Sequence, residues 1–366
     1  MRSPADLLAS LIEAGKIPSA SWLVGDAEGV LSSGALGQAV LHPAEAPAGE
    51  ETIYDLASLT KPLVTGLLAL ILGRQAGIRL DEPVRRFLPE FDREDKKEIR
   101  LFHLLTHTSG LPDWAPLYAA GSSLPDYVHQ IARMAPRHRP GAATLYSDPG
   151  YIALGALIEK VGATSLDRLA RELIFERTRS GACFRPGPEL RCRVAATEES
   201  CKYERRKAGA SAHGYRGWRE GVIHGEVHDQ NAWVLGGVAG NAGLFGNARD
   251  VWLIAREILA GPSSLLHEED RRRLARKETG DLPEPRSIAF RINQGPDGES
   301  DPGTAAGRAL AAEAFGHNGF TGTSVWLDPR AGRLFVLLTN RVHPEVRDDV
   351  DMNEIRREFH RLAAAT

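Results

Sequence analysis

The 366-residue sequence has few cysteines, and they follow no recognisable pattern. Cys183, Cys192 and Cys201 stand nine residues apart, and none belongs to a C-x-x-C pair. This spacing matches no zinc-binding pattern, and reduced thiols are the default state in a cytosolic protein. The cysteines therefore predict neither a disulfide framework nor a metal site.

An excess of positive charge is also missing. The formal net charge is -3, whereas a nucleic-acid surface normally needs a basic excess. Two short basic clusters, residues 205–207 and 271–273, stand beside glutamate and aspartate residues and are typical of a solvated face. We therefore expect no nucleic-acid partner.

The first 14 residues lack the basic region and long apolar core of a signal peptide. Leu7, Leu8, Leu11 and Ile12 instead predict an amphipathic helix. We expect no membrane span and a cytoplasmic protein. A chain whose leader had been removed would look the same, so a periplasmic location stays open.

Alternating residues predict strands at both ends of the chain, over 19–25, 30–37, 323–328 and 333–340. Helical patterns fill the middle, and an amphipathic helix is predicted over about 350–363. The economical fold is α+β: one antiparallel sheet built from both termini, flanked by helices, with a mostly helical insertion. We expect one domain over 1–366, with an α/β region of about 1–57 and 308–366 and a mainly helical region of about 58–307.

Three segments of the middle region carry weaker signals. Residues 180–221 are polar and poorly periodic and predict irregular surface. The glycines of 225–246 favour close backbone packing near a site over a dinucleotide loop. The segment from His224 to His228 resembles a metalloprotease helix, but Glu226 stands one place too late and Gly225 is a poor helix residue. Metal ligation there is the less favoured interpretation.

The strongest chemical signal is Ser58-Leu59-Thr60-Lys61, which opens the apolar run 63–72. Positions i and i+3 share a helix face, so the ammonium of Lys61 can reach the hydroxyl of Ser58. A lysine with its proton lost or shared can activate a serine, and a helix N-terminus offers N–H groups to an oxyanion. The competing interpretation is a helix cap followed by a surface lysine.

Two further elements follow in order, Tyr146-Ser147-Asp148 and His317-Asn318-Gly319. With Ser58-x-x-Lys61 they resemble the serine β-lactamase and penicillin-recognising superfamily, whose S-x-x-K and K-T-G elements are characteristic. The closer similarity is to the class C-like branch, which carries Y-x-N and often H-x-G. Residues 103–112 and 146–151 also resemble stretches common in that branch, and the resemblance covers nearly the whole chain.

The resemblance implies a β-lactamase/transpeptidase-like fold and a role for each matching residue. Ser58 is the acylated nucleophile, Lys61 helps to deprotonate it, and Tyr146 shuttles protons as a phenol whose pKa Lys61 lowers. The N–H groups of Ser58 and Phe320 form the oxyanion hole. Asp148, His317, Asn318 and Gly319 bind substrate, and Gly319 leaves room for it. No metal or other cofactor is implied.

Two departures from the family pattern bear on the substrate. Asp148 replaces the usual Asn, and an ionised carboxylate cannot donate a hydrogen bond to a substrate carbonyl, although it can pair with Lys61. His317 and Asn318 replace Lys and Thr or Ser, and losing a fixed cation weakens capture of a carboxylate. An ester or a neutral amide is therefore favoured over a penicillin.

The leading hypothesis is a metal-independent serine hydrolase acting on a small ester, amide or D-amino acid peptide. The alternative is a penicillin-binding-like sensor that is acylated without turnover or only binds its ligand. A metallohydrolase using His224 and His228 is a third hypothesis.

Overall fold

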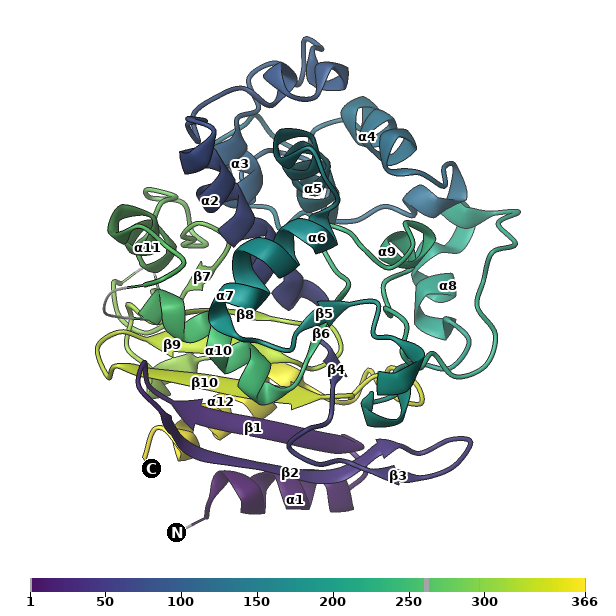
Figure 1. Cartoon of the computed structure of the whole chain (residues 1–366), viewed down its shortest axis with the longest axis vertical. Helices are drawn as coiled ribbons and strands as arrows, with labels where there is room; N and C mark the ends of the chain where they lie inside the picture. Colours follow the sequence, from purple (N-terminus) through teal and green to yellow (C-terminus); the bar gives the residue numbers. More distant parts are fainter. Residues whose placement is uncertain (1, 260–262, 296, 366) are drawn as a thin grey trace.

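The computed structural model describes residues 2–259, 263–295 and 297–365. Its largest element is an antiparallel sheet to which both ends of the chain contribute neighbouring strands (Figure 1). The strand order is β3 (Ala46–Pro47), β2 (Val30–Val40), β1 (Ser19–Gly25), β10 (Arg333–Thr339), β9 (Ser324–Asp328), β8 (Phe315–Asn318) and β7 (Arg291–Ile292). The predicted sheet of both termini is thereby confirmed, and the short strand β7, which was not among the predicted strands, joins its edge.

Helices cover both faces of this sheet, so its central strands β1 and β10 are buried on both sides. Trp22 packs with the terminal helices α1 (Pro4–Glu13) and α12 (Met352–Ala363). Leu23, the next residue, faces the opposite core, where α10 (Ala248–Leu259) packs against β1 and β10. The period of two in the strand thus separates the two cores.

The rest of the chain forms a helical region beside the sheet, with a second sheet of order β4-β6-β5 between them (Figure 1). Its strands are β4 (Tyr54–Asp55), β5 (Cys183–Phe184) and β6 (Leu244–Gly246). The α-helices are α2 (Leu67–Gln75), α3 (Leu101–Leu105), α4 (Leu124–Arg133), α5 (Asp148–Gly162), α6 (Leu166–Ala170), α7 (Glu176–Thr178), α8 (Lys202–Ala208), α9 (Gln230–Val234) and α11 (Glu268–Ala275). The 3₁₀ turns are η1 (Ala57–Leu59), η3 (Val84–Arg86), η4 (Pro89–Phe91), η5 (Leu117–Ala119), η7 (Pro188–Arg193), η8 (Gly209–Ala212) and η9 (Gly307–Ala309).

The helix after Ser58 is composite. The 3₁₀ turn η1 leads into a π-helical turn, η2 (Lys61–Gly66), and then into α2; a second π turn is η6 (Arg171–Phe175). In the described part of the chain, Ala57–Gln75 is the one helix long and apolar enough to cross a membrane, and 89% of that window is buried inside the protein. A core helix of a folded protein meets the same criterion.

The prediction of irregular surface for residues 180–221 holds for most of the segment, whose residues are largely exposed or half-buried, but it misses a buried part. Val194, Glu198 and Glu204 are buried, and residues 202–208 form α8. Glu204 and Lys207 line the same cavity as Ser58. The buried positions of the segment include charged residues, so hydrophobic periodicity does not reveal them.

Close packing is present at Gly237, Gly240 and Gly243, whereas nothing lies within 4 Å of a Cβ atom at Gly236; Gly240 is the clearest case. A Cβ atom at Gly240 would collide with the carbonyl oxygen of Tyr151 and lie 3.0 Å from the Cα atom of Gly155, both in α5. The contact brings the next residue, Asn241, to the ammonium of Lys61, to which its carbonyl accepts a hydrogen bond at 3.0 Å.

We expect Gly240→Ala to lower the free energy of unfolding by about 1–3 kcal/mol, because the added methyl group overpacks the contact with α5. Urea denaturation measures the change. Gly49→Ala is the matched control, since nothing lies within 4 Å of a Cβ atom at Gly49. Equal stability of the two variants would contradict the packing argument.

Candidate active site

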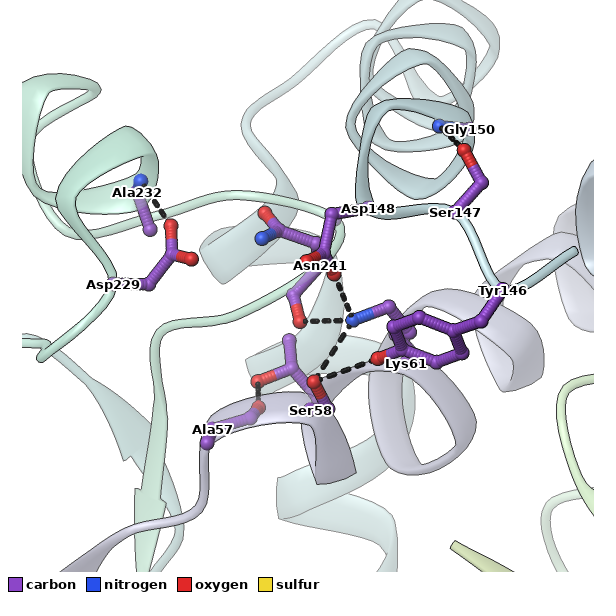
Figure 2. Close-up of polar contacts among 12 residues, drawn as sticks. Ala57, Ser58, Lys61, Tyr146, Ser147, Asp148, Gly150, Asp229, Ala232 and Asn241 are labelled. Carbon is purple, nitrogen blue, oxygen red and sulfur yellow. Dashed lines mark hydrogen bonds and ion pairs between the residues drawn. The ribbon is translucent and has the colours of Figure 1, made fainter. Parts of the chain in front are cut away.

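The structure brings Ser58, Lys61 and Tyr146 together, although Tyr146 is 88 residues from Ser58 in the sequence (Figure 2). The phenol of Tyr146 donates a hydrogen bond to Ser58 Oγ at 2.8 Å, and Lys61 Nζ donates to the same oxygen at 3.0 Å. Ser58 lies in η1 and Lys61, three residues later, opens η2, so the two side chains share one face of the composite helix. The competing interpretation of Lys61 as a surface lysine is wrong, because its side chain is fully buried.

The turn that presents Ser58 is held by the buried carboxylate of Asp55. Ala57 has a φ of +47°, which is costly for a residue with a Cβ atom. Its N–H donates to Asp55 Oδ1 at 2.8 Å, and the other oxygen of Asp55 accepts the N–H of His228 at 2.7 Å. One carboxylate therefore fixes both the strained turn and the backbone of His228.

Lys61 keeps its charge in spite of complete burial. Burial lowers the pKa of its ammonium, but the nearby charge of Asp148 and the contact with Tyr146 raise it, and the net direction is upward. Asp148 Oδ1 lies 2.7 Å from Nζ, so the pairing that the sequence left open is present. The ammonium thus acts as a hydrogen-bond donor and a fixed positive charge rather than as a free base.

Lys61 lowers the pKa of Tyr146 as expected, but this effect does not decide the net direction. Burial raises the pKa of the phenol; the charge of Lys61 lowers it, Asp148 raises it again, and the net direction is upward. Tyr146 is therefore a neutral phenol at rest, which agrees with its donating to Ser58. The sequence indicated the neighbouring cation but not the depth of burial.

Local structure around Tyr146 sets its direction. Ser147 caps α5 by accepting the N–H of Gly150 at 3.0 Å, which places Tyr146 just before the helix and Asp148 at its first position. The imidazole of His107 stacks on the Tyr146 ring with centroids 4.5 Å apart and accepts the N–H of Ser147 at 2.9 Å. Burial lowers the pKa of His107 well below its usual value, so this supporting ring is neutral.

Ser58 and Phe320 line the same cavity. Among the described residues, no hydrogen bond is donated by the N–H of either one. The turn after β8 is anchored to the Ser58 turn, since the hydroxyl of Thr321 donates to the carbonyl of Asp55 at 2.7 Å. Two free N–H groups on linked turns beside a hydroxyl are what an oxyanion hole requires.

The remaining predicted substrate contacts differ from expectation at two positions. His317 does not line the cavity; its ring packs 5.9 Å from that of Tyr146, and burial lowers its pKa well below the usual value. Gly319 lines the cavity, but a Cβ there would collide with Thr323 Oγ1 and lie 2.8 Å from the carbonyl of Leu56. That glycine is needed for contact between protein segments, not to make room for substrate. Asn318 and Asp148 do line the cavity.

The cavity measures about 430 Å³. Several of its polar residues were not singled out from the sequence: Asp113, Glu204, Lys207, Asp229, Arg341 and Arg356. His228, which also lines the cavity, was considered only as a possible metal ligand. Arg341 Nε donates to the carbonyl of Phe320 at 2.9 Å, and Arg356 Nη2 donates to that of Gly319 at 3.1 Å. Both arginines thus hold the turn that carries Phe320.

The two histidines of the metalloprotease-like segment do not converge on one point. His224 Nε2 lies 2.8 Å from the carbonyl of Val194, and His228 Nε2 lies 3.0 Å from Glu198 Oε2. In residues 2–259, 263–295 and 297–365, no group of three or more His, Cys, Asp or Glu side chains is arranged to hold a metal ion.

A serine, a lysine and a tyrosine beside two free N–H groups form the arrangement expected from the resemblance to the penicillin-recognising superfamily. The model of the Beta-lactamase family matches residues 5–358, and the chain belongs to this family. The resemblance inferred from the three motifs is thereby confirmed.

Relatives in sequence and structure agree with this assignment. The chain is 28% identical over 331 residues to a protein of Salmonella agona (strain SL483) named "Putative D-alanyl-D-alanine carboxypeptidase", covering 82% of this chain and 72% of that one. It superposes on simvastatin synthase (LovD) of Aspergillus terreus with a TM-score of 0.76 and 19% identity, covering 99% and 97% of the two chains. It superposes on the hydrolase EstCE1 with a TM-score of 0.73 and 19% sequence identity, covering 97% of both chains. The two structural matches show the shared fold.

We expect Asp148→Asn to lower the free energy of unfolding at pH 7 by about 3 kcal/mol, near the lower end for breaking a buried ion pair, since Asp148 is 17% exposed. The raised pKa of Lys61 means that the pair stabilises the fold below the ordinary lysine pKa of 10.5 and that this stability is lost as pH rises through the folded pKa. The difference between wild type and variant should therefore shrink at alkaline pH, as followed by urea denaturation.

Asp81→Asn is the control, because Asp81 pairs with Arg79 on the surface, where both side chains are more than half exposed. We expect no measurable change from it at any pH. A pH-independent loss in Asp148→Asn would show that Lys61 is not the group responsible.

Proposed function

We propose that the protein is a metal-independent serine hydrolase of the class C-like branch, working through an acyl-enzyme on Ser58. The observation that carries the proposal is the pair of hydrogen bonds that Ser58 Oγ receives from Tyr146 at 2.8 Å and Lys61 at 3.0 Å. A serine held by two donors next to two free N–H groups has the parts that acyl transfer needs.

In the proposed acylation, Ser58 Oγ attacks the substrate carbonyl carbon, and the carbonyl oxygen becomes an oxyanion between the N–H groups of Ser58 and Phe320. The Ser58 proton passes to the oxygen of Tyr146 while the phenol gives its own proton to the leaving group. Lys61 remains charged against Asp148 and lowers the energy of negative charge on Ser58 Oγ. The bond to the leaving group then breaks, and the acyl group stays on Ser58.

A neutral ester or amide is favoured over an anionic penicillin because His317 and Asn318 stand where the family pattern has Lys and Thr or Ser, so the usual fixed cation is missing. Asp148 is balanced by Lys61. The two arginines already donate to backbone carbonyls. The names of the relatives, a carboxypeptidase and a hydrolase with acyltransferase activity, are consistent with esters and D-amino acid peptides as substrates.

We expect a fluorophosphonate probe to label Ser58 covalently and Ser58→Ala to lose both labelling and hydrolysis of p-nitrophenyl acetate. Intact-protein mass spectrometry with peptide mapping identifies the modified residue. A parallel assay with nitrocefin, a chromogenic β-lactam, should give a kcat/KM below that for the ester. Labelling elsewhere, or full esterase activity in Ser58→Ala, would end the proposal.

The same ester assay separates hydrolysis from the alternative of a sensor without turnover. A hydrolase releases p-nitrophenol over many cycles, whereas a sensor releases at most one equivalent per protein molecule. A single burst with no steady state would favour the sensor.

We expect Tyr146→Phe to slow acylation by about 10²–10⁴-fold, the usual contribution of a positioned proton-transfer group. The fold should persist because the ring still stacks on His107. Stopped-flow measurement of the p-nitrophenol burst gives the acylation rate, and the thermal unfolding temperature checks the fold. An unchanged burst rate would remove Tyr146 from the proposed mechanism.

A further inference from the structure

A second ionisable pair, His228 and Glu198, lies at the wall of the cavity. His228 Nε2 is 3.0 Å from Glu198 Oε2, and the two side chains are only 6% and 1% exposed. The other carboxylate oxygen accepts the N–H of Tyr203 at 2.6 Å. With both its oxygens engaged, the carboxylate favours the tautomer in which Nε2 of His228 carries the proton.

This arrangement leaves Nδ1 of His228 as the unprotonated nitrogen. In the described part of the chain, no hydrogen bond to Nδ1 is present, and His228 lines the cavity that contains Ser58. Its ring stacks on Phe320, with centroids 5.5 Å apart and planes at 28°. The residue therefore borders the proposed oxyanion hole and has a lone pair available to a molecule in the cavity.

The position of His228 is fixed relative to Ser58 by Asp55. The two oxygens of this one carboxylate accept the N–H of His228 and the N–H of Ala57, which precedes the nucleophile. Arg219 holds the other side of the same backbone by donating to the His228 carbonyl at 2.6 Å. Hydrogen bonds to both its N–H and its carbonyl therefore fix the backbone of His228 relative to Ser58.

We propose that His228, oriented by Glu198, is the general base for hydrolysis of the acyl-enzyme; this inference rests on the proposed function of Ser58. Water attacks the acyl carbonyl carbon while one of its protons moves to His228 Nδ1. The oxyanion collapses, the bond from carbon to Ser58 Oγ breaks, and Oγ takes the proton of Tyr146. The imidazolium then returns its proton to the Tyr146 phenolate through solvent, so the protons balance.

The division of labour follows from the state of Tyr146. Its pKa is raised by burial, so the phenol is neutral at rest and acts on Ser58 as a donor. In deacylation the proton of Tyr146 is needed at the departing Ser58 Oγ, and an unprotonated nitrogen bordering the same cavity gives the attacking water a separate acceptor. The lone pair of a neutral imidazole is such an acceptor.

We expect His228→Asn to leave the burst of p-nitrophenol from p-nitrophenyl acetate within about 2-fold of wild type and to slow the steady state by about 10²–10³-fold. The acetyl-enzyme should accumulate and be visible by mass spectrometry. His228→Phe keeps a ring against Phe320 without an acceptor and should behave the same way. Glu198→Gln can still accept from Nε2 and should lose only about 10-fold.

Two readouts separate a base from a packing role. Hydroxylamine, a stronger nucleophile than water, should restore turnover in His228→Asn. The pH profile of the deacylation rate should differ between wild type and the variant, because the variant lacks the imidazole. The charged groups around His228 are Glu198 at Nε2, Asp55 and Arg219 at its backbone, and Asp229 and Glu204 in the same cavity.

Each outcome decides one question. Parallel loss of burst and steady state in both His228 variants, or an unchanged steady state, would overturn the role of His228 while Ser58 labelling upholds the proposed function. No acylation of wild-type Ser58 would overturn the proposed function itself. Thermal unfolding of each variant confirms that a folded protein is being compared.

Discussion

The site depends on the charge of one fully buried lysine. An ammonium removed from water is costly unless it is compensated, and Lys61 is compensated by Asp148 at 2.7 Å, the carbonyl of Asn241 and the hydroxyl of Ser58. These three partners come from the start of α5, the glycine-rich segment and η1. Satisfying one charge therefore aligns three segments that are distant in the sequence.

A second carboxylate organises the opposite side of the cavity. Asp55 joins the backbone of Ala57 to that of His228, and its own carbonyl accepts the hydroxyl of Thr321. The nucleophile, the imidazole and the turn with Phe320 thus share a single support. Burial raises the pKa of Asp55, but two backbone N–H groups favour its ionised form.

The features that could be predicted from the sequence depend on neighbouring residues, and the features that could not be predicted depend on tertiary contacts. The spacing of Ser58 and Lys61 fixes their proximity within one helical turn, and alternation predicted the strands of both termini. Tyr146 could be placed only through the family resemblance, since nothing local brings it to Ser58.

The site features that the sequence did not predict all depend on how distant segments pack together. Glu198 and His228 are 30 residues apart, and their pairing depends on how residues 180–221 fold back on the site. Burial, which sets the pKa of Tyr146, likewise has no signature in the sequence around it. The burial of His317 outside the cavity was missed for the same reason, because a motif does not show which way a side chain faces in the packed strand.

The anchoring of Phe320 has a consequence for the order in which the site can be completed during synthesis. Arg356 of α12 donates to the carbonyls of Gly319 and Thr323. Arg341 lies two residues after the end of β10, and β10 pairs with β1. A nascent chain that has emerged from the ribosome only as far as residue 320 already contains its nucleophile, lysine and tyrosine. It still lacks β10 and α12, whose neighbouring arginines hold the turn that carries Phe320, so the proposed site is complete only after α12 has emerged.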